Sequence, residues 1–180
     1  MSRQGAGPVV LRSAVLADAA ELAELHLSSW RATYDPLLDP ADRARLTLAE
    51  RLAAWQRRLA AEPGGVWLAE RDGHLVGFVS VEPAPEADLG PDRIAEVTSL
   101  HVSPNLHGQG LGRRLLAHAE AQLSAAGYEQ ALLWVLASNR AARDFYERHG
   151  WHVDGVALRR EMGGLAGLPL VDEVRYRRSL

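Results

Sequence analysis

Three glycines stand at alternating positions, Gly108, Gly110 and Gly112, after an apolar segment and directly before a helical pattern. Glycine costs conformational entropy in ordered chain, so this spacing needs a physical reason. The beginning of a helix leaves about four backbone N–H groups unpaired and carries roughly half a positive charge, and together these bind phosphates. The sequence therefore predicts a phosphate cradle, although a tight turn that merely joins two elements is an alternative for the loop taken alone.

The residues that follow the glycines narrow the choice of phosphate compound. A loop that binds ATP in the P-loop manner needs Gly-Lys-Ser/Thr, whereas Gly112 is followed by Arg113-Arg114. The dinucleotide fingerprint G-x-G-x-x-G belongs to a first strand, and this loop lies in the middle of the chain and does not continue that pattern. Neither a P-loop nor a dinucleotide-binding motif is expected here.

Length and composition set outer limits on the function. The chain has 180 residues, a formal net charge of −3 and no cysteine. This length fits one domain. The weak negative charge predicts neither a nucleic-acid partner nor a membrane-binding tail, and no apolar run approaches the ~18 residues of a membrane span. Without cysteine and without an apolar leader segment, we expect a cytoplasmic protein. No metal is expected, because His149 and His152 flank Gly150 without acids nearby.

The hydrophobic pattern alternates between strand-like and helix-like segments. Strands are expected over 8–14, 66–70, 74–82, 94–102, 131–136, 150–158 and 172–180. Helices are expected after Asp18 as N-cap, over 41–62, over 111–123 and over 139–149. Asp72-Gly73 predicts a hairpin turn. The expected fold is α/β (α+β), with a mixed, mostly antiparallel, twisted sheet of about six to seven strands and helices on both faces.

Two motifs together resemble the GNAT superfamily of N-acetyltransferases. The first is the run from His107 to Gly112, and the second comprises Asn139, Phe145-Tyr146 and Gly150-Trp151. The close match covers residues 95–151, and the element order extends it to one N-acetyltransferase domain over 1–180, with residues 1–7 flexible. His107 departs from the family pattern, in which Gln or Arg is usual, and this puts one side-chain contact in doubt.

The resemblance implies that acetyl-coenzyme A is the co-substrate. It implies a cleft where two parallel strands, Ile94–Val102 and Ala131–Leu136, splay apart. The pantetheine arm would pair with the first strand, and the pyrophosphate would meet the N–H groups of the glycine loop. Asn139 would hold the donor from the far side, with a helix N-cap as its alternative role. The residues expected to bind the donor are Leu100, His101, Val102, His107, Gly108, Gln109, Gly110, Leu111, Gly112, Arg113, Asn139 and Tyr146.

The resemblance also implies the catalytic groups. Tyr146 would be the general acid that protonates the leaving thiolate, and a tyrosine of the core is its alternative. Glu96 is the first candidate for the base that takes a proton from the amine, and a structural ion pair with an arginine is its alternative. His101 is the second candidate, although strand alternation directs its ring to the opposite face. Water chains are the third possibility.

The acceptor is expected to be a primary amine of a small molecule or a peptide N-terminus, attacking directly in a ternary complex. In this family the first helices and the loop between the last two strands shape the acceptor site, which here indicates Trp30, Tyr34, Asp35 and the segment Met162–Leu168. The alternatives to an enzyme are a non-catalytic acyl-coenzyme A-binding regulatory module and a nucleotide-binding protein. A homodimer could form through a sheet edge or the last strand.

Overall fold

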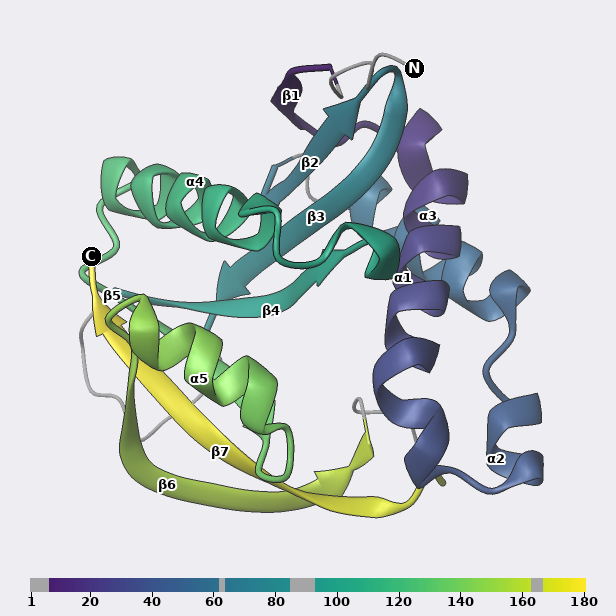
Figure 1. Cartoon of the computed structure of the whole chain (residues 1–180). Helices are drawn as coiled ribbons and strands as arrows, with labels where there is room; N and C mark the ends of the chain where they lie inside the picture. The colour runs from purple at the N-terminus through teal and green to yellow at the C-terminus, as the bar shows by residue number, and fades with distance from the viewer. Residues whose placement is uncertain (1–6, 62–63, 85–92, 163–166) are drawn as a thin grey trace, which may run out of the picture. The chain divides into compact units, whose positions relative to one another are not determined.

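The computed structural model describes residues 7–61, 64–84, 93–162 and 167–180. The chain forms seven strands and five α-helices in these residues (Figure 1). The elements are β1 (Val9–Ser13), α1 (Ala19–Tyr34), α2 (Pro40–Ala44), α3 (Leu48–Ala61), β2 (Val66–Arg71), β3 (His74–Pro83), β4 (Ile94–Val102), α4 (Leu111–Ala125), β5 (Gln130–Leu136), α5 (Arg140–Arg148), β6 (His152–Glu161) and β7 (Leu170–Ser179). The strand order in the sheet is β1-β2-β3-β4-β5-β7-β6.

The chain divides into two compact units, and each is described by itself. The first unit contains residues 1–80 and 99–119, and the second contains residues 81–98 and 120–180. Strands β3 and β4 and helix α4 contribute residues to both units. The single domain over 1–180 stays a prediction, and the expected flexibility of residues 1–7 concerns residues that lie, except for Gly7, outside the described part of the chain.

In the first unit, β2 pairs antiparallel with both β1 and β3. The expected hairpin turn is present, with φ of 54° at Asp72 and 78° at Gly73. Two successive positive φ values are typical of the tight turn that Asp-Gly favours between strands. The hairpin therefore forms where the sequence predicted it.

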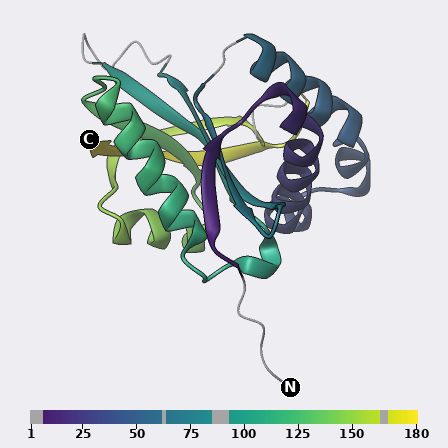
Figure 2. The same ribbon diagram turned by 90° about the horizontal axis from the view of Figure 1, so that it is seen from above.

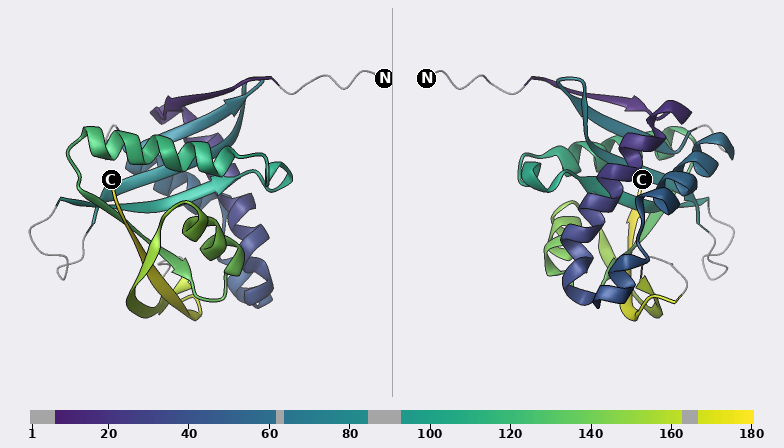
Figure 3. Two further views of the ribbon diagram at one scale, coloured as in Figure 1. Left: turned by 60° about the vertical axis from the view of Figure 1, so that its left-hand side comes forward. Right: turned by 90° about the vertical axis from the view of Figure 1, so that its right-hand side faces the viewer.

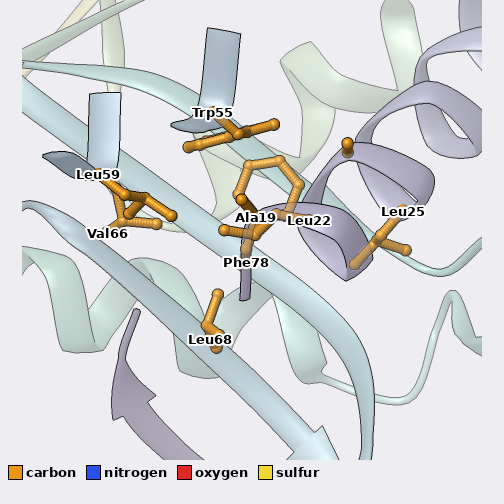
Figure 4. Packing of buried hydrophobic residues seen from close by; sticks show 9 residues of the cluster. Ala19, Leu22, Leu25, Trp55, Leu59, Val66, Leu68 and Phe78 are labelled. Carbon is orange, nitrogen blue, oxygen red and sulfur yellow. The ribbon is translucent and has the colours of Figure 1, made fainter. Parts of the chain in front are cut away.

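The core of the first unit lies between β2 and β3 on one side and α1 and α3 on the other. Figure 4 shows this packing, in which Trp55 of α3 and Leu22 of α1 lie around Phe78 of β3, and Leu59 of α3 lies beside Val66 of β2. Figure 3 (right) shows α1 and α3 running side by side. Phe78 is fully buried, as are Leu22 and Leu68.

The first half of α4 covers the opposite face of β2 and β3 (Figure 2). The ring of Trp67 in β2 contacts His118 of α4, with 5.5 Å between the ring centroids. A Cβ atom at Gly77 of β3 would lie 2.9 Å from Cδ1 of Leu115 in α4 and 3.0 Å from the backbone oxygen of His101, so a larger residue would require its neighbours to shift. The expected helices on both faces of the sheet are thus found.

In the second unit, β7 pairs antiparallel with β5 and β6, and α5 lies against these strands (Figure 3, left). Strands β4 and β5 are parallel, with Ile94, Ala95 and Glu96 as register partners of residues 130–132. The pairing thus joins the beginnings of the two strands, and β4 runs on to Val102. The mixed, mostly antiparallel sheet of seven strands confirms the expected fold class.

Two local expectations are wrong. Residues 41–62 do not form one helix, because α2 ends at Ala44 and α3 begins at Leu48. The side chain of Thr47 accepts a hydrogen bond from the N–H of Glu50, whose carboxylate lies 3.4 Å from the Thr47 nitrogen, and this reciprocal capping starts a new helix. Asp18 precedes α1 but does not cap it, because its carboxylate binds Arg12 instead.

Candidate functional site

The glycine loop leads from β4 into α4 through a short 3-10 turn at Pro104–Leu106. Gly108 and Gly110 have φ values of 77° and 79°, a conformation that other residues adopt at a cost. A Cβ atom at either position would meet no heavy atom within 4 Å, so glycine is needed for the backbone angle and the space beside the loop is open. Gly112 lies inside the first turn of α4.

The N–H groups of residues 108–113 point to an anion site. Among the described residues none of these six groups donates to a protein acceptor, and the first N–H of α4 that does is that of Arg114, at 3.1 Å from the carbonyl oxygen of Gly110. Unpaired N–H groups at a helix N-terminus bind phosphate through hydrogen bonds and the helix dipole. The loop therefore has the donors that the sequence predicted.

Two side chains of the loop hold it to neighbouring strands of the first unit. Nε2 of His107 lies 3.1 Å from the carbonyl oxygen of Val102, the last residue of β4. Oε1 of Gln109 accepts a hydrogen bond of 2.9 Å from Nη1 of Arg71 in β2. His107 and Gln109 thus each contact a neighbouring strand, and their binding to the donor stays a prediction.

The two arginines after the loop differ in what they contact. Arg114 donates from Nη2 to the carbonyl oxygen of Val9 in β1, at 3.0 Å. Arg113 is exposed and has no hydrogen-bond or salt-bridge partner among the described residues. Arg113 is therefore the arginine whose charge is available to an anion at this loop.

The end of β4 is joined to α1 by a hydrogen-bonded group of three residues. Nδ1 of His101 lies 3.2 Å from Oγ of Ser29, and the Ser29 hydroxyl lies 3.3 Å from the carbonyl oxygen of Val102. The ring of His101 packs on His26 and Phe78, with centroid distances of 4.7 and 5.3 Å. His101 therefore faces α1 and the core of the first unit.

Burial and a nearby positive charge keep His101 and the adjacent His26 neutral. Burial lowers the pKa of His101 to about 4, and the positive charge of Arg51 acts in the same direction. Burial likewise lowers the pKa of His26 well below its usual range, with His101 and Arg51 adding to the effect. Nε1 of Trp55 donates to Nδ1 of His26 at 3.2 Å, which places the proton of the neutral His26 ring on Nε2.

In the second unit, Asn139 caps α5. Its Oδ1 atom accepts from the N–H of Ala142 at 3.1 Å, so the alternative role suggested for this residue is present. The side-chain NH₂ group is the part that a ligand could use.

Tyr146 and Glu96 are both half-buried residues of the second unit. The ring of Tyr146 packs against Phe145 and Trp151, at centroid distances of 5.2 and 6.1 Å. Glu96 is the third residue of β4 and the register partner of Leu132. Tyr146 is therefore positioned by aromatic packing around α5, and Glu96 by parallel strand pairing.

Tyr176 of β7 is fully buried and carries a hydroxyl group in contact with α5, and it is not among the residues predicted for the site. Its hydroxyl donates to Oε1 of Glu147 at 2.6 Å and accepts from Nε of Arg143 at 3.1 Å, which joins β7 to α5. Burial and the Glu147 hydrogen bond raise the pKa of Tyr176. Nothing in the local sequence pattern marks this residue, because its partners lie 29 and 33 positions away.

The residues suggested for the acceptor gather at the end of α1. Trp30 is buried, and its ring lies 4.5 Å from that of Tyr34, centroid to centroid. Oδ1 of Asp35 is buried without a hydrogen-bond partner among the described residues. Of the segment Met162–Leu168, Met162 and Leu168 are buried, and residues 163–166 lie outside the described part of the chain.

Within the described ranges, no three His, Cys, Asp or Glu side chains come together as metal ligands would. None of the described helices combines the length and the hydropathy that crossing a bilayer requires.

Comparison with known proteins identifies the family. The profile of the acetyltransferase (GNAT) family matches residues 20–151, which is more than half of the chain. The chain belongs to the GNAT family of acetyltransferases. This membership confirms the family resemblance and makes the protein an acyltransferase, and the matched region contains both the glycine loop and the Asn139–Trp151 segment.

Individual relatives agree with the GNAT assignment. A probable N-acetyltransferase of Mycobacterium tuberculosis, Rv2775, is 30% identical over 151 residues, which cover 81% of this chain and 80% of that protein. A mycothiol acetyltransferase of Geodermatophilus obscurus is 38% identical over 101 residues, 55% of this chain, but the match spans only 33% of that longer protein. The crystal structure of the PaiA N-acetyltransferase of Thermoplasma acidophilum with coenzyme A has a TM-score of 0.71 at 20% identity, covering 96% of this chain and 99% of the other. The last similarity supports the fold.

Proposed function

We propose that this protein transfers an acetyl group from acetyl-coenzyme A to a primary amine of a small molecule or a peptide N-terminus. The observation that carries the donor assignment is the row of unpaired N–H groups at residues 108–113, which suits a diphosphate. Family membership and the coenzyme A bound to the PaiA N-acetyltransferase support the same donor. Arg113 adds a positive charge at the loop.

The proposed reaction is a direct displacement. The amine nitrogen forms a bond to the thioester carbonyl carbon, the C–S bond breaks, and the amine loses one proton while the leaving thiolate gains one. We assign the proton donor to Tyr146. We assign the base to Glu96, as the family resemblance implies, because the ring of His101 packs on His26 and Phe78 in the core of the first unit.

Asp35 supports an acceptor with a positive charge. A buried carboxylate oxygen without a donor is unfavourable, and an ammonium group would provide the missing hydrogen bond. Trp30 and Tyr34 lie close to Asp35 in the chain and are proposed to frame the same acceptor.

The absence of cysteine agrees with the cytoplasm as the compartment of the reaction. A homodimer through an edge of the sheet, β1 or β6, stays a prediction, whereas the last strand, β7, is already paired on both sides, with β5 and β6.

The deciding experiment is free-thiol release from acetyl-coenzyme A in the presence of a panel of primary amines. Wild-type protein is expected to release thiol with at least one amine, and Tyr146→Phe to lose at least tenfold in kcat while keeping its affinity for acetyl-coenzyme A. Tyr128→Phe, which alters a tyrosine stacked with Arg93 elsewhere in the second unit, is the matched control and should keep its rate. Donor binding without thiol release would favour the regulatory module, and equal competition by ATP would favour a nucleotide-binding protein.

A further inference from the structure

Arg51 is a cation on the core-facing side of α3. It lies one turn before Trp55 and two turns before Leu59, so the three side chains share one face of the helix. Trp55 and Leu59 are buried in the core of the first unit, and Leu52 packs against the same cluster. The face of α3 that packs on the core therefore begins with the half-buried Arg51.

The guanidinium of Arg51 is stabilised by the negative charge of the adjacent Glu50 but forms no salt bridge with it. It has neither a hydrogen-bond acceptor nor a salt bridge among the described residues. The carboxylate of the adjacent Glu50 is occupied by Thr47, with 3.0 Å between Oε2 and Oγ1. Burial lowers the pKa of Arg51, and the negative charge of Glu50 offsets this effect only in part.

The surroundings of Arg51 connect it with the end of β4. Its neighbour on the helix face, Trp55, donates to His26, and the ring of His26 packs on His101. The charge of Arg51 lowers the pKa of both rings, which agrees with a position close to them. Under the proposed function, the pantetheine arm pairs with β4 at His101, so Arg51 would be close to the reacting groups.

We propose that Arg51 binds a carboxylate of the acceptor, so that the acceptor is an amine that also carries a carboxylate, such as an amino acid. A guanidinium presents paired N–H donors that match a carboxylate, and such charged hydrogen bonds are strong where water is partly excluded. The neutral rings of His26 and His101 leave the positive charge of Arg51 as the feature that an anion would meet. This inference rests on the proposed function for the identity of the acceptor.

The kinetic test compares glycine, L-alanine, β-alanine and γ-aminobutyrate with their primary amides in the thiol-release assay. For the best acceptor, the carboxylate form is expected to exceed its amide in kcat/KM by roughly 10- to 100-fold, the range of a charged hydrogen bond. Arg51→Gln should abolish this ratio mainly through KM, and Arg51→Lys should retain part of it. Arg57→Gln, an exposed arginine of the same helix, should leave the ratio unchanged.

Equal rates for acids and amides, or the same behaviour in Arg51→Gln and Arg57→Gln, would overturn the proposal. The other source of a carboxylate is the acyl group of the donor, and a comparison of acetyl- with succinyl-coenzyme A tests this source. A preference for the succinyl donor that disappears in Arg51→Gln would place the carboxylate on the acyl group and overturn the assignment to the acceptor.

A binding measurement keeps this inference separate from the proposed function. N-acetyl-L-alanine, but not its amide, is expected to shift the ring resonances of His26 and His101 in NMR spectra of the wild type, and Arg51→Gln should remove this response. If no amine is acetylated but the carboxylate still produces the shift, the proposed function fails and the carboxylate site stands. If amines are acetylated but N-acetyl-L-alanine does not shift the two ring resonances, the proposed function stands and only the carboxylate site at Arg51 is wrong. Arg51→Gln should also unfold at nearly the same temperature as the wild type, because it removes a partly buried charge that forms no hydrogen bond or salt bridge among the described residues.

Discussion

Nε2 of His107 lies 3.1 Å from the carbonyl oxygen of Val102, and this contact ties the glycine loop to the end of β4. The same carbonyl oxygen lies 3.3 Å from the Ser29 hydroxyl, so the last residue of β4 is held both by the loop and by α1. A carbonyl oxygen has two lone pairs and can accept from both donors. The geometry of the loop is thus set by side chains that leave its own N–H groups unpaired.

Replacement of His107 tests this tether. His107→Ala removes the donor to Val102, and we expect the affinity for acetyl-coenzyme A to fall by roughly 3- to 10-fold, the value of one ordinary hydrogen bond. His107→Gln keeps an N–H donor and should retain most of the affinity. Calorimetric titration with acetyl-coenzyme A measures both variants, and equal affinity in His107→Ala and the wild type would show that the tether does not position the loop.

Gly110→Ala tests the backbone conformation of the loop. A φ of 79° costs a non-glycine residue about 1 kcal/mol or more, so both stability and donor affinity should fall. Gly155→Ala is the matched control, because Gly155 has a φ of 90° and open space around its Cβ position but lies in β6. The two variants should lose similar free energy of unfolding in urea, while only Gly110→Ala should bind acetyl-coenzyme A about tenfold more weakly. Equal donor affinity in the two variants would contradict the loop's role.

Two tyrosines of the second unit should respond in opposite ways. Tyr176→Phe removes two hydrogen bonds from a buried hydroxyl, to exposed Glu147 and half-buried Arg143, so we expect a loss of about 1 kcal/mol in the free energy of unfolding. Its rate of acetyl transfer, measured well below the melting temperature, should be nearly normal. Tyr146→Phe should retain stability and lose rate. If Tyr176→Phe lost rate at full stability, the acid role would belong to Tyr176.

The depressed pKa of His101 predicts a dependence of stability on pH. The folded-state pKa is about 4 and the unfolded value about 6.5, so the unfolded chain binds more protons between these values. The stabilisation is fully present above pH 6.5 and is lost progressively as the pH falls toward 4, by up to about 3 kcal/mol. Urea unfolding of wild type and His101→Gln at pH 7, 5.5 and 4.5 measures this, and the variant should show the shallower slope. Parallel slopes would show that His101 is not responsible.

The sequence predicted those parts of the site that depend on neighbouring residues. Positive φ at Gly108 and Gly110, the hairpin at Asp72-Gly73 and the cap at Asn139 are each fixed within a few residues of chain. Thr47-x-x-Glu50 carried the same kind of signal for the beginning of α3, and it was missed because the apolar pattern continues across the break.

The group around His101 could not be predicted in the same way. Ser29 and His101 are 72 positions apart, and their contact exists only because α1 packs on the end of β4. Among the described residues Arg51 forms no salt bridge, although Glu50 is adjacent to it, and a sequence pattern does not reveal this. Strand alternation did direct the ring of His101 away from the face of Leu100 and Val102, and the observed packing on His26 agrees with that direction.

The central claim is that the backbone N–H groups of residues 108–113 bind the diphosphate of acetyl-coenzyme A through hydrogen bonds. The most direct measurement is a ¹H–¹⁵N correlation spectrum recorded with acetyl-coenzyme A and, separately, with acetyl-pantetheine, which lacks the diphosphate. We expect the amide signals of residues 108–113 to shift strongly with acetyl-coenzyme A and little with acetyl-pantetheine, which should also bind much more weakly. If these six signals stay in place while acetyl-coenzyme A binds, the assignment of the donor site to this loop is wrong.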